Sequence, residues 1–325
     1  FFFAGPVAGI DGISAYNDVA VAGILFAVFY ALDVWSEDRN PRWWPVIGAL
    51  AGFAYAAKYT AFLALPFAIV WLIISLRRTP RQAARACAIV VLVASIWVAP
   101  WMIRNAIWVG NPVSPFFNRI FPNPFVHVSF EERYRADMSF YPGLTSRWAI
   151  PTEVTVKGHA LGGVIGPLFL LSPLALLALR NPAGRRLFAA LAVFGVTYFA
   201  NVGSRFLIPV LPFLSLALAI GVAPARGALV FLAISHAFAS LPSVLNVYCD
   251  RYAWRLNQIP FRAAFRLERE EDFLCRMSPL YTTARLSDQI VPQGARVYAA
   301  SQITEAYSTR EIVEGQHSAE GEIRL

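Results

Sequence analysis

About eight apolar stretches, each long enough to cross or nearly cross a bilayer, follow one another in the chain before Asp250. Hydrophobic residues make up 57% of the chain and charged residues 15%, whereas a soluble domain has about 45–50% and 25%. Backbone groups in lipid must hydrogen-bond within their own segment, which favours helices. The sequence therefore predicts an α-helical polytopic membrane protein. The expected segments are Val19–Trp35, Trp43–Ala57, Tyr59–Leu76, Ala86–Trp108, Leu161–Leu179, Leu187–Val202, Phe206–Ala223 and Ala228–Val247.

The short connections between these segments indicate the orientation in the membrane. The sequence RRTPRQAAR at 77–85 holds four arginines, and RNPAGRR at 180–186 holds three. With Ser36–Arg42 and Arg226, these connections fall on one side, which the positive-inside bias assigns to the cytoplasm. We therefore attribute the formal charge of +8 to membrane orientation and expect no nucleic-acid partner. The opposite side receives residues 11–18, Lys58, 203–205, a long loop and the tail.

Two domains are expected. Residues 1–249 form a multi-pass transmembrane domain whose external loop, about 109–159, is rich in Pro and aromatic residues. Residues 250–325 form an extracytoplasmic tail, in which Phe261–Met277 reads as an amphipathic helix and 295–300 and 311–313 as strands. This pattern is typical of the start of a small α/β domain. Cys249, just before this tail, and Cys275 within it could pair if the region is extracytoplasmic.

The sequence begins at Phe1, inside an apolar run that reaches Ile10. A charged region and a cleavage site do not precede this run, so it is not an intact signal peptide. We expect a fragment whose N-terminal membrane segments are missing.

The tetrad Ala15-Tyr16-Asn17-Asp18 directly precedes an apolar helix on the predicted external side. Asp18 has two interpretations: it caps the free N–H groups of the helix, as Asp often does, or it faces a polar cavity. An ionisable group at the membrane edge is a functional candidate by default. Asp11 reads as a weaker version of the same feature, a solvated loop residue.

Three cations accompany Asp18 on the predicted external side. Lys58 lies in a very short connection, where it either snorkels to the surface or anchors an anionic headgroup or diphosphate. Arg205 begins a Pro-interrupted helix, SRFLIPVLP, and is either a phosphate contact or an orientation anchor. Arg104 closes another apolar segment, and the sequence leaves open whether it faces the same cavity. Gly48 and Gly52, four residues apart, allow close packing between helices.

Four motifs taken in order resemble one family. These are AYND at 15–18, GALAGFAYAAKYTAFLALP at 48–66, APWMIRNAIWVGNPVSPFF at 99–117 and SRFLIPVLP at 204–212. Their order is similar to that of bacterial GT-C membrane glycosyltransferases, family 39 type, which are related to protein mannosyltransferases and to the aminoarabinose transferase of lipid A. The tail phrase at 270–301 resembles the periplasmic tail of that group.

The resemblance implies inverting sugar transfer from a polyprenyl-phosphate donor to a lipid, glycan or protein acceptor in a bacterial inner membrane. A carboxylate would act as general base, and cations or a divalent metal would stabilise the phosphate leaving group. Asp18 would then be the second acidic position, and the main base would lie upstream of Phe1. Substrate would contact Lys58, Tyr59, Arg104 and Arg205. Since no His or Cys shows metal-ligand spacing, the sequence leaves a metal cofactor open.

Two other classes compete with this interpretation. A transporter or flippase of a lipid-linked or anionic solute would also use Pro-broken helices and an external cation. The sequence shows no inverted repeat, and a long structured outer loop suits an enzyme better. A structural scaffold in the membrane is the third class, and it predicts no effect of Asp18 or Arg205 substitutions on any turnover.

Overall fold

The computed structural model describes residues 1–13, 16–124, 126, 128–141, 143–248, 261–299 and 305–314. The chain divides into two compact units. The first consists of Phe1–Met102 with Arg135–Val247, and the second of Ile103–Tyr134 with Tyr248–Leu325. Each unit is described separately below.

Apolar helices occupy all eight places that the sequence indicates. Four are long and apolar enough to cross a membrane: Asp18–Asp38, Pro80–Val109, Pro182–Ala200 and Ser204–Val222. Four shorter ones are Trp43–Ala57, Tyr59–Ser75, Pro167–Arg180 and Arg226–Ser240. The prediction of a polytopic helical membrane protein is confirmed at this level, and the number of crossings beyond four stays a prediction.

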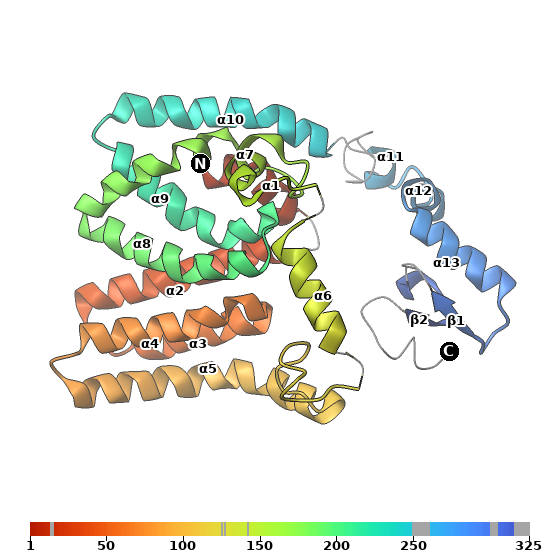
Figure 1. Ribbon diagram of the computed structural model, residues 1–325, viewed down its shortest axis with the longest axis horizontal. Helices are drawn as coiled ribbons and strands as arrows, with labels where there is room; N and C mark the ends of the chain where they lie inside the picture. The colour runs from red at the N-terminus through yellow and green to blue at the C-terminus, as the bar shows by residue number, and fades with distance from the viewer. Residues whose placement is uncertain are drawn as a thin grey trace. The chain divides into compact units, whose positions relative to one another are not determined.

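In Figure 1 the apolar helices of the first unit lie in rows with their axes nearly aligned, from α5 to α10. Proline coincides with a change of helix type in one of these segments. Pro209 lies in a 3₁₀ segment that precedes the α-helix starting at Leu211. The elements are α1 (Pro6–Gly12), α2 (Asp18–Asp38), α3 (Trp43–Ala57), η2 (Tyr59–Leu63), α4 (Ala64–Ser75), α5 (Pro80–Val109), α6 (Val128–Ser139), α7 (Ile150–Thr152), η4 (Glu153–Lys157), η5 (Pro167–Arg180), α8 (Pro182–Gly195), η6 (Val196–Ala200), η7 (Ser204–Val210), α9 (Leu211–Val222) and α10 (Arg226–Tyr248).

Aromatic side chains fill the centre of the first unit. Phe29 of α2 meets Phe213 of α9 edge-on, with ring centres 5.4 Å apart. Phe67 of α4 and Phe194 of α8 approach to 4.9 Å. Such pairs add dispersion and quadrupole attraction to the burial of their area, so four helices are held around one core.

Small residues let α3 approach α5 at backbone distance. A Cβ atom added to Gly48 would lie 2.6 Å from the carbonyl oxygen of Val90, and one added to Gly52 would lie 2.5 Å from that of Ala94. Both distances are too short for any side chain. The expected close contact at these two glycines is confirmed.

The long loop is folded, as its composition indicates. Within the second unit the side chain of Asn111 is fully buried and donates to the Phe116 carbonyl at 2.8 Å. Asn118 is also buried and donates to Glu131 at 2.9 Å. Buried amides with satisfied hydrogen bonds fix a loop in one conformation.

The tail differs in part from its prediction. The segment Phe261–Met277 is not one amphipathic helix, because the chain turns at Arg266, whose φ is 57°. It forms α11 (Phe261–Ala264) and α12 (Glu270–Met277), and a further helix, α13 (Pro279–Ile290), follows. The expected strands are present as β1 (Arg296–Ala299) and β2 (Glu311–Glu314), which pair in parallel.

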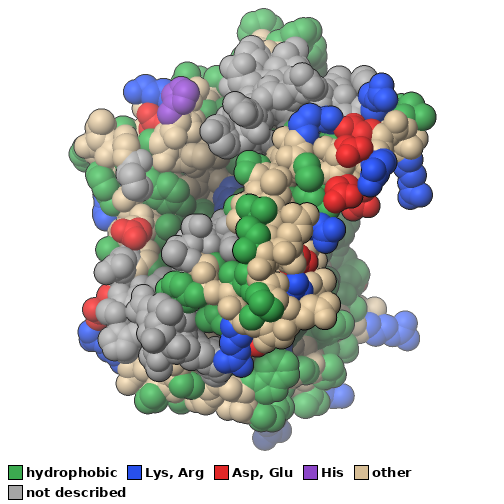
Figure 2. Space-filling view, turned by 90° about the vertical axis from the view of Figure 1, so that its right-hand side faces the viewer, with side chains coloured by type: hydrophobic (Ala, Val, Ile, Leu, Met, Phe, Trp, Pro, Cys, Tyr) green, Lys and Arg blue, Asp and Glu red, His purple; other side chains and the backbone are tan. Residues whose placement is uncertain are grey.

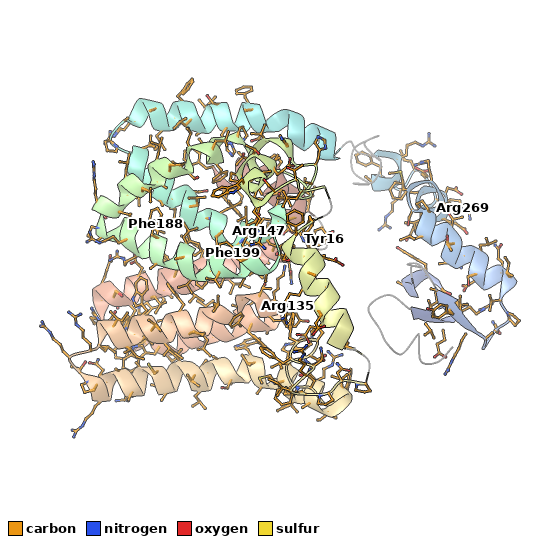
Figure 3. The ribbon with its side chains drawn as sticks, viewed as in Figure 1. Tyr16, Arg135, Arg147, Phe188, Phe199 and Arg269 are labelled. Carbon is orange, nitrogen blue, oxygen red and sulfur yellow. The ribbon has the colours of Figure 1, made fainter. Side chains whose placement is uncertain are left out.

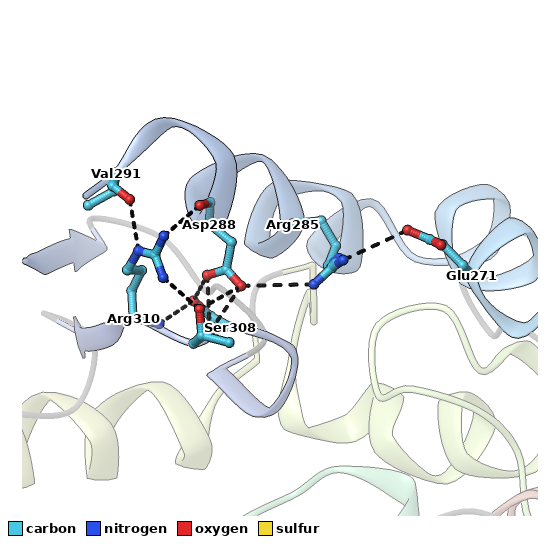
Figure 4. A network of polar contacts seen from close by, with 7 residues as sticks. Glu271, Arg285, Asp288, Val291, Ser308 and Arg310 are labelled. Atoms are coloured by element: carbon cyan, nitrogen blue, oxygen red, sulfur yellow. Dashed lines mark hydrogen bonds and ion pairs between the residues drawn. The ribbon is translucent and has the colours of Figure 1, made fainter. Parts of the chain in front are cut away.

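A polar network ties α13 to the start of β2 (Figure 4). Asp288 accepts the Ser308 hydroxyl at 2.7 Å and the Thr309 N–H at 3.0 Å. Arg310 donates to the carbonyl oxygens of Asp288 and Val291 at 2.7 and 2.8 Å. The described tail thus contains helices packed with a small parallel sheet. Its side of the membrane stays a prediction, and the proposed partner of Cys275, Cys249, lies outside the described residues.

Basic and acidic side chains lie interspersed among hydrophobic ones on the face shown in Figure 2. Charges of both signs gather there on exposed elements of the chain, as expected for residues at or beyond the ends of apolar helices.

Candidate active site at the Asp18 end of the helix bundle

The connection between α2 and α3 brings two distant charges together. These helices run antiparallel because only four residues join them, so the start of α2 lies beside the end of α3. The Asn17 side chain donates to the Ala57 carbonyl at 2.7 Å and fixes this contact. Lys58, in an extended conformation directly after α3, therefore faces Asp18, the first residue of α2. We call this end of the first unit the Asp18 end; Figure 3 labels Tyr16 there.

Asp18 and Lys58 form a buried ion pair. The Lys58 ammonium donates to Oδ1 of Asp18, and their side chains are 17% and 2% exposed, respectively. A buried charge without a partner is costly. The ion pair with Asp18 therefore explains how Lys58 can lie in so short a connection. The predicted topology placed these two residues on the same side of the membrane, and the structure brings them into direct contact.

Asp11, not Asp18, accepts the hydrogen bond that caps α2. Oδ2 of Asp11 accepts the Val19 N–H at 2.8 Å, and the residue is only 2% exposed. The prediction of a solvated loop residue is wrong, because α1 places Asp11 inside the packed end of the bundle. The hydrogen bond that Val19 donates to Asp11 thus takes the place of the cap that was expected of Asp18.

The two carboxyl groups influence each other. Burial raises the pKa of Asp11 above its ordinary value, and the nearby carboxyl group of Asp18 raises it further. The Val19 N–H and the Lys58 ammonium act in the opposite direction. Oδ1 of Asp11 is buried and meets no hydrogen-bond donor within the described part of the chain. A proton on Asp11, directed at Asp18, would satisfy both groups.

Two aromatic rings hold Arg205. Its guanidinium carbon lies 4.2 Å from the ring centre of Tyr16 and 4.8 Å from that of Phe206. The Lys58 ammonium lies 5.3 Å from the same Phe206 ring. One ring therefore supports both cations, and cation–π attraction stabilises each of them. Among the described residues, no carboxylate forms an ion pair with Arg205.

The backbone before Arg205 is fixed from several directions. The Ser204 N–H donates to the Leu161 carbonyl at 2.8 Å, and the Val202 N–H to that of Met138 at 3.1 Å. The Tyr141 hydroxyl donates to Asn201 at 2.8 Å. A position held by this many bonds presents Arg205 in one orientation, which is the preorganisation that charge stabilisation requires.

The remaining predicted site residues are Tyr59 and Arg104. Tyr59 follows Lys58 directly, and its ring is 44% exposed at the start of η2. Arg104 belongs to the second unit, where its guanidinium lies 4.1 Å from the Trp108 ring. The role of both in substrate binding stays a prediction.

A metal ion would find only carboxylates here. In the parts of the chain that the structure describes, no three residues among His, Cys, Asp and Glu gather to hold one. Asp11 and Asp18 offer two carboxyl groups, and the ammonium of Lys58 already faces Asp18. The described positive charges at this site are those of Lys58 and Arg205.

Sequence reasoning missed two participants, Tyr16 and Phe206, and gave Asp11 only a minor, solvated place. Tyr16 and Phe206 stand within the quoted motifs, but each of the three residues gains its role through contacts with another segment. The apolar surroundings of Asp11 in PVAGIDG were the available signal, because a lone carboxylate in such a helix is seldom solvated on all sides.

Comparison with known proteins adds one finding. Residues 6–103 match the family dolichyl-phosphate-mannose-protein mannosyltransferase. The match covers under a third of the chain and includes Asp11, Asp18 and Lys58, but it ends before Arg104 and Arg205. No curated protein and no solved structure matches. Together with the apolar helices, this similarity indicates an integral membrane glycosyltransferase of the mannosyltransferase type.

Proposed function

We propose that the chain transfers a sugar from a polyprenyl-phosphate donor to an acceptor hydroxyl, and that the reaction takes place at the Asp18 end. In this proposal the Asp18 end and the tail are extracytoplasmic, in a bacterial inner membrane. The acceptor is a lipid, a glycan or a protein. The observation that supports the proposal most is the pair of cations on one ring, Lys58 and Arg205 on Phe206.

The chemistry needs two kinds of group. The acceptor oxygen attacks the sugar C1 from the face opposite the phosphate, its proton passes to a carboxylate, and the C1–O bond breaks with its electrons on the phosphate. The configuration at C1 is inverted. Charge that develops on the leaving phosphate is stabilised by fixed cations.

The described residues divide these tasks. Arg205 has a planar fork of donors that matches phosphate oxygens, and no carboxylate of the described residues forms an ion pair with it. Lys58 adds a second positive charge, oriented by Asp18. Asp18 takes the second acidic position rather than that of the general base, and Asp11 fixes the start of the same helix by accepting the N–H of the next residue, Val19.

Substitution of Arg205 tests the proposal. In membranes that contain the full protein, Arg205→Gln should lower kcat/KM for transfer from a labelled polyprenyl-phosphate sugar by about 10²–10³-fold, because a fixed donor to the leaving group is lost. Arg180→Gln is the matched control, since it removes the same charge from the opposite end of the bundle. Equal activity of the two variants would contradict the proposal.

The same membranes separate an enzyme from a transporter. If the labelled lipid-linked sugar crosses the bilayer unchanged, and Arg205→Gln abolishes that movement, the flippase interpretation is favoured instead. Formation of a new glycoside with release of polyprenyl phosphate supports transfer. The two products are distinguished by extraction and chromatography.

A further inference from the structure

The opposite end of the bundle contains a basic hollow that the proposed reaction does not use. It has a volume of about 560 Å³ and lies between the end of α2, the end of α4 and the start of α5. Its lining residues are Arg39, Ile74, Ser75, Leu76, Arg77, Arg78, Thr79 and Gln82. We call it the Arg39 hollow.

Three arginines from two separate connections line it. Arg39 ends α2 in a left-handed conformation, with φ 55°, and its side chain reaches the Ser75 carbonyl at 3.5 Å. Arg77 and Arg78 follow α4. The start of the 30-residue helix α5 adds the positive end of its dipole. No acidic residue lines the hollow.

The carboxylate that precedes Arg39 in the sequence, Asp38, is directed elsewhere. Asp38 accepts the Trp43 ring N–H at 2.9 Å and the Asn40 N–H at 2.8 Å. Both partners belong to the connection after α2. The positive charge of the hollow is therefore not neutralised by the residue that precedes Arg39.

An exposed apolar lane leads from the hollow along α4. Val70 and Ile74 are 54% and 61% exposed, and Ile73 beside them is 49% exposed. Val70 and Ile74 share one face of α4, because they are four residues apart, and Ile74 also lines the hollow. A ligand bound in the hollow would thus meet apolar side chains next to its charged group.

A second hollow at the same end lacks this combination. It has a volume of about 700 Å³, lies between η5 and α9, and contains one arginine, Arg180. Of the neighbouring arginines, Arg186 pairs with Asp33 at 2.6 Å, and neither Arg185 nor Arg186 lines this hollow. The position of arginines at this end of the bundle is therefore not enough to produce a hollow that several of them line.

We propose that the Arg39 hollow binds the phosphate headgroup of an anionic phospholipid, with the acyl chains along the exposed face of α4. Arginine guanidinium groups recognise phosphate oxygens, and basic pockets between membrane helices bind such headgroups. Free inorganic phosphate shares this chemistry, but it has nothing to place on the apolar lane. A lipid uses both features.

Native mass spectrometry of the purified full protein tests this assignment. The protein is incubated with an equimolar mixture of phosphatidylglycerol and phosphatidylcholine, without any sugar donor. We expect preferential retention of phosphatidylglycerol, and a loss of affinity of about tenfold or more in Arg39→Asn/Arg77→Gln/Arg78→Gln. Asn is chosen at position 39 because it tolerates a positive φ. Arg77→Gln/Arg78→Gln is a second variant that leaves Arg39 unchanged.

The matched control is Arg180→Gln/Arg185→Gln/Arg226→Gln, which removes the same charge from the same end. It should retain phosphatidylglycerol as the wild type does. An equal loss in this control, or no loss in either Arg39-hollow variant, overturns the proposal. Displacement of the lipid by excess inorganic phosphate, but not by potassium chloride of equal ionic strength, would assign the hollow to free phosphate instead.

Discussion

The two ends of the helix bundle in the first unit carry charge in different ways. At the Asp18 end, the ion pair of Asp18 and Lys58 is buried, and Asp11 beside it is 2% exposed. At the other end, Arg39 and Arg77 are exposed and have no acidic residue in their hollow. The first arrangement is fixed by partners, and the second is open to a ligand from outside.

The difference follows from the cost of burial. A charge removed from water needs a partner and hydrogen bonds, or its pKa shifts until it is neutral. The Asp18 end meets this requirement with opposite charges, an N–H group and two aromatic rings. Arginines in water need no such compensation, so same-sign clusters persist at the Arg39 end. We therefore expect sugar transfer at the Asp18 end, where the charges have fixed partners, and headgroup binding at the Arg39 end, where they face the surroundings.

The largest effect is expected from breaking the buried pair. Asp18→Asn leaves the Lys58 ammonium without its counter-ion in a largely buried position, which costs about 3–5 kcal/mol of unfolding free energy. The rate of sugar transfer should fall together with the stability. Thermal unfolding in detergent and transfer assays in membranes measure the two quantities.

A double variant separates charge burial from function. Asp18→Asn/Lys58→Met removes both charges, so we expect most of the stability to return while transfer stays low. The counterpart at the other end, Arg226→Gln, should change stability by about 0.5 kcal/mol or less. If Asp18→Asn were as mild as Arg226→Gln, the contrast between the two ends would be wrong.

The fold was largely predictable from the sequence, because apolar length and arginine placement act locally. All eight helices lie where those signals place them, and the side assignment brings Asp18 and Lys58 to one end. The contacts of Asp11, Tyr16 and Phe206 were not predictable, since each depends on packing between segments far apart in the chain. The tail shows the same limit: its helical pattern gave no sign of the turn at Arg266.

A medium effect is expected from separating α3 and α5. Gly52→Ala places a Cβ atom 2.5 Å from the Ala94 carbonyl oxygen, so the backbones must move apart. Overpacking of this kind costs about 1–3 kcal/mol. Because Gly52 lies in α3 shortly before Lys58, transfer should decline, whereas phosphatidylglycerol retention at the Arg39 hollow should persist.

The matched control for this change is Gly23→Ala. No atom lies within 4 Å of a Cβ added at Gly23, which is also in a membrane helix. This variant should unfold at the wild-type temperature or slightly above it, because Ala favours helices over Gly. An equal loss in both variants would show that the close approach of α3 and α5 has no special importance.

The smallest effect concerns the protonation of Asp11. Its raised pKa means that the folded protein keeps the proton on this carboxyl group to a higher pH than the unfolded chain does. Stability from this residue is fully present below the ordinary pKa of Asp and is lost as the pH rises through the raised value. Asp11→Asn resembles the neutral form, since its amide oxygen can accept the Val19 N–H and its NH₂ group can donate to Asp18.

The pH dependence of unfolding therefore distinguishes a protonated Asp11 from a charged one. Between about pH 4 and pH 8 the wild type should lose stability relative to Asp11→Asn, by about 1 kcal/mol or less. Asp288→Asn in the tail supplies the opposite sign, because the Ser308 hydroxyl lowers the pKa of Asp288. There the wild type should gain stability relative to the variant as the pH rises. Parallel curves for the wild type and Asp11→Asn would mean that Asp11 is ionised throughout. The Asp18 end would then hold two negative charges against Lys58, and its balance of charge would depend on Arg205 as well.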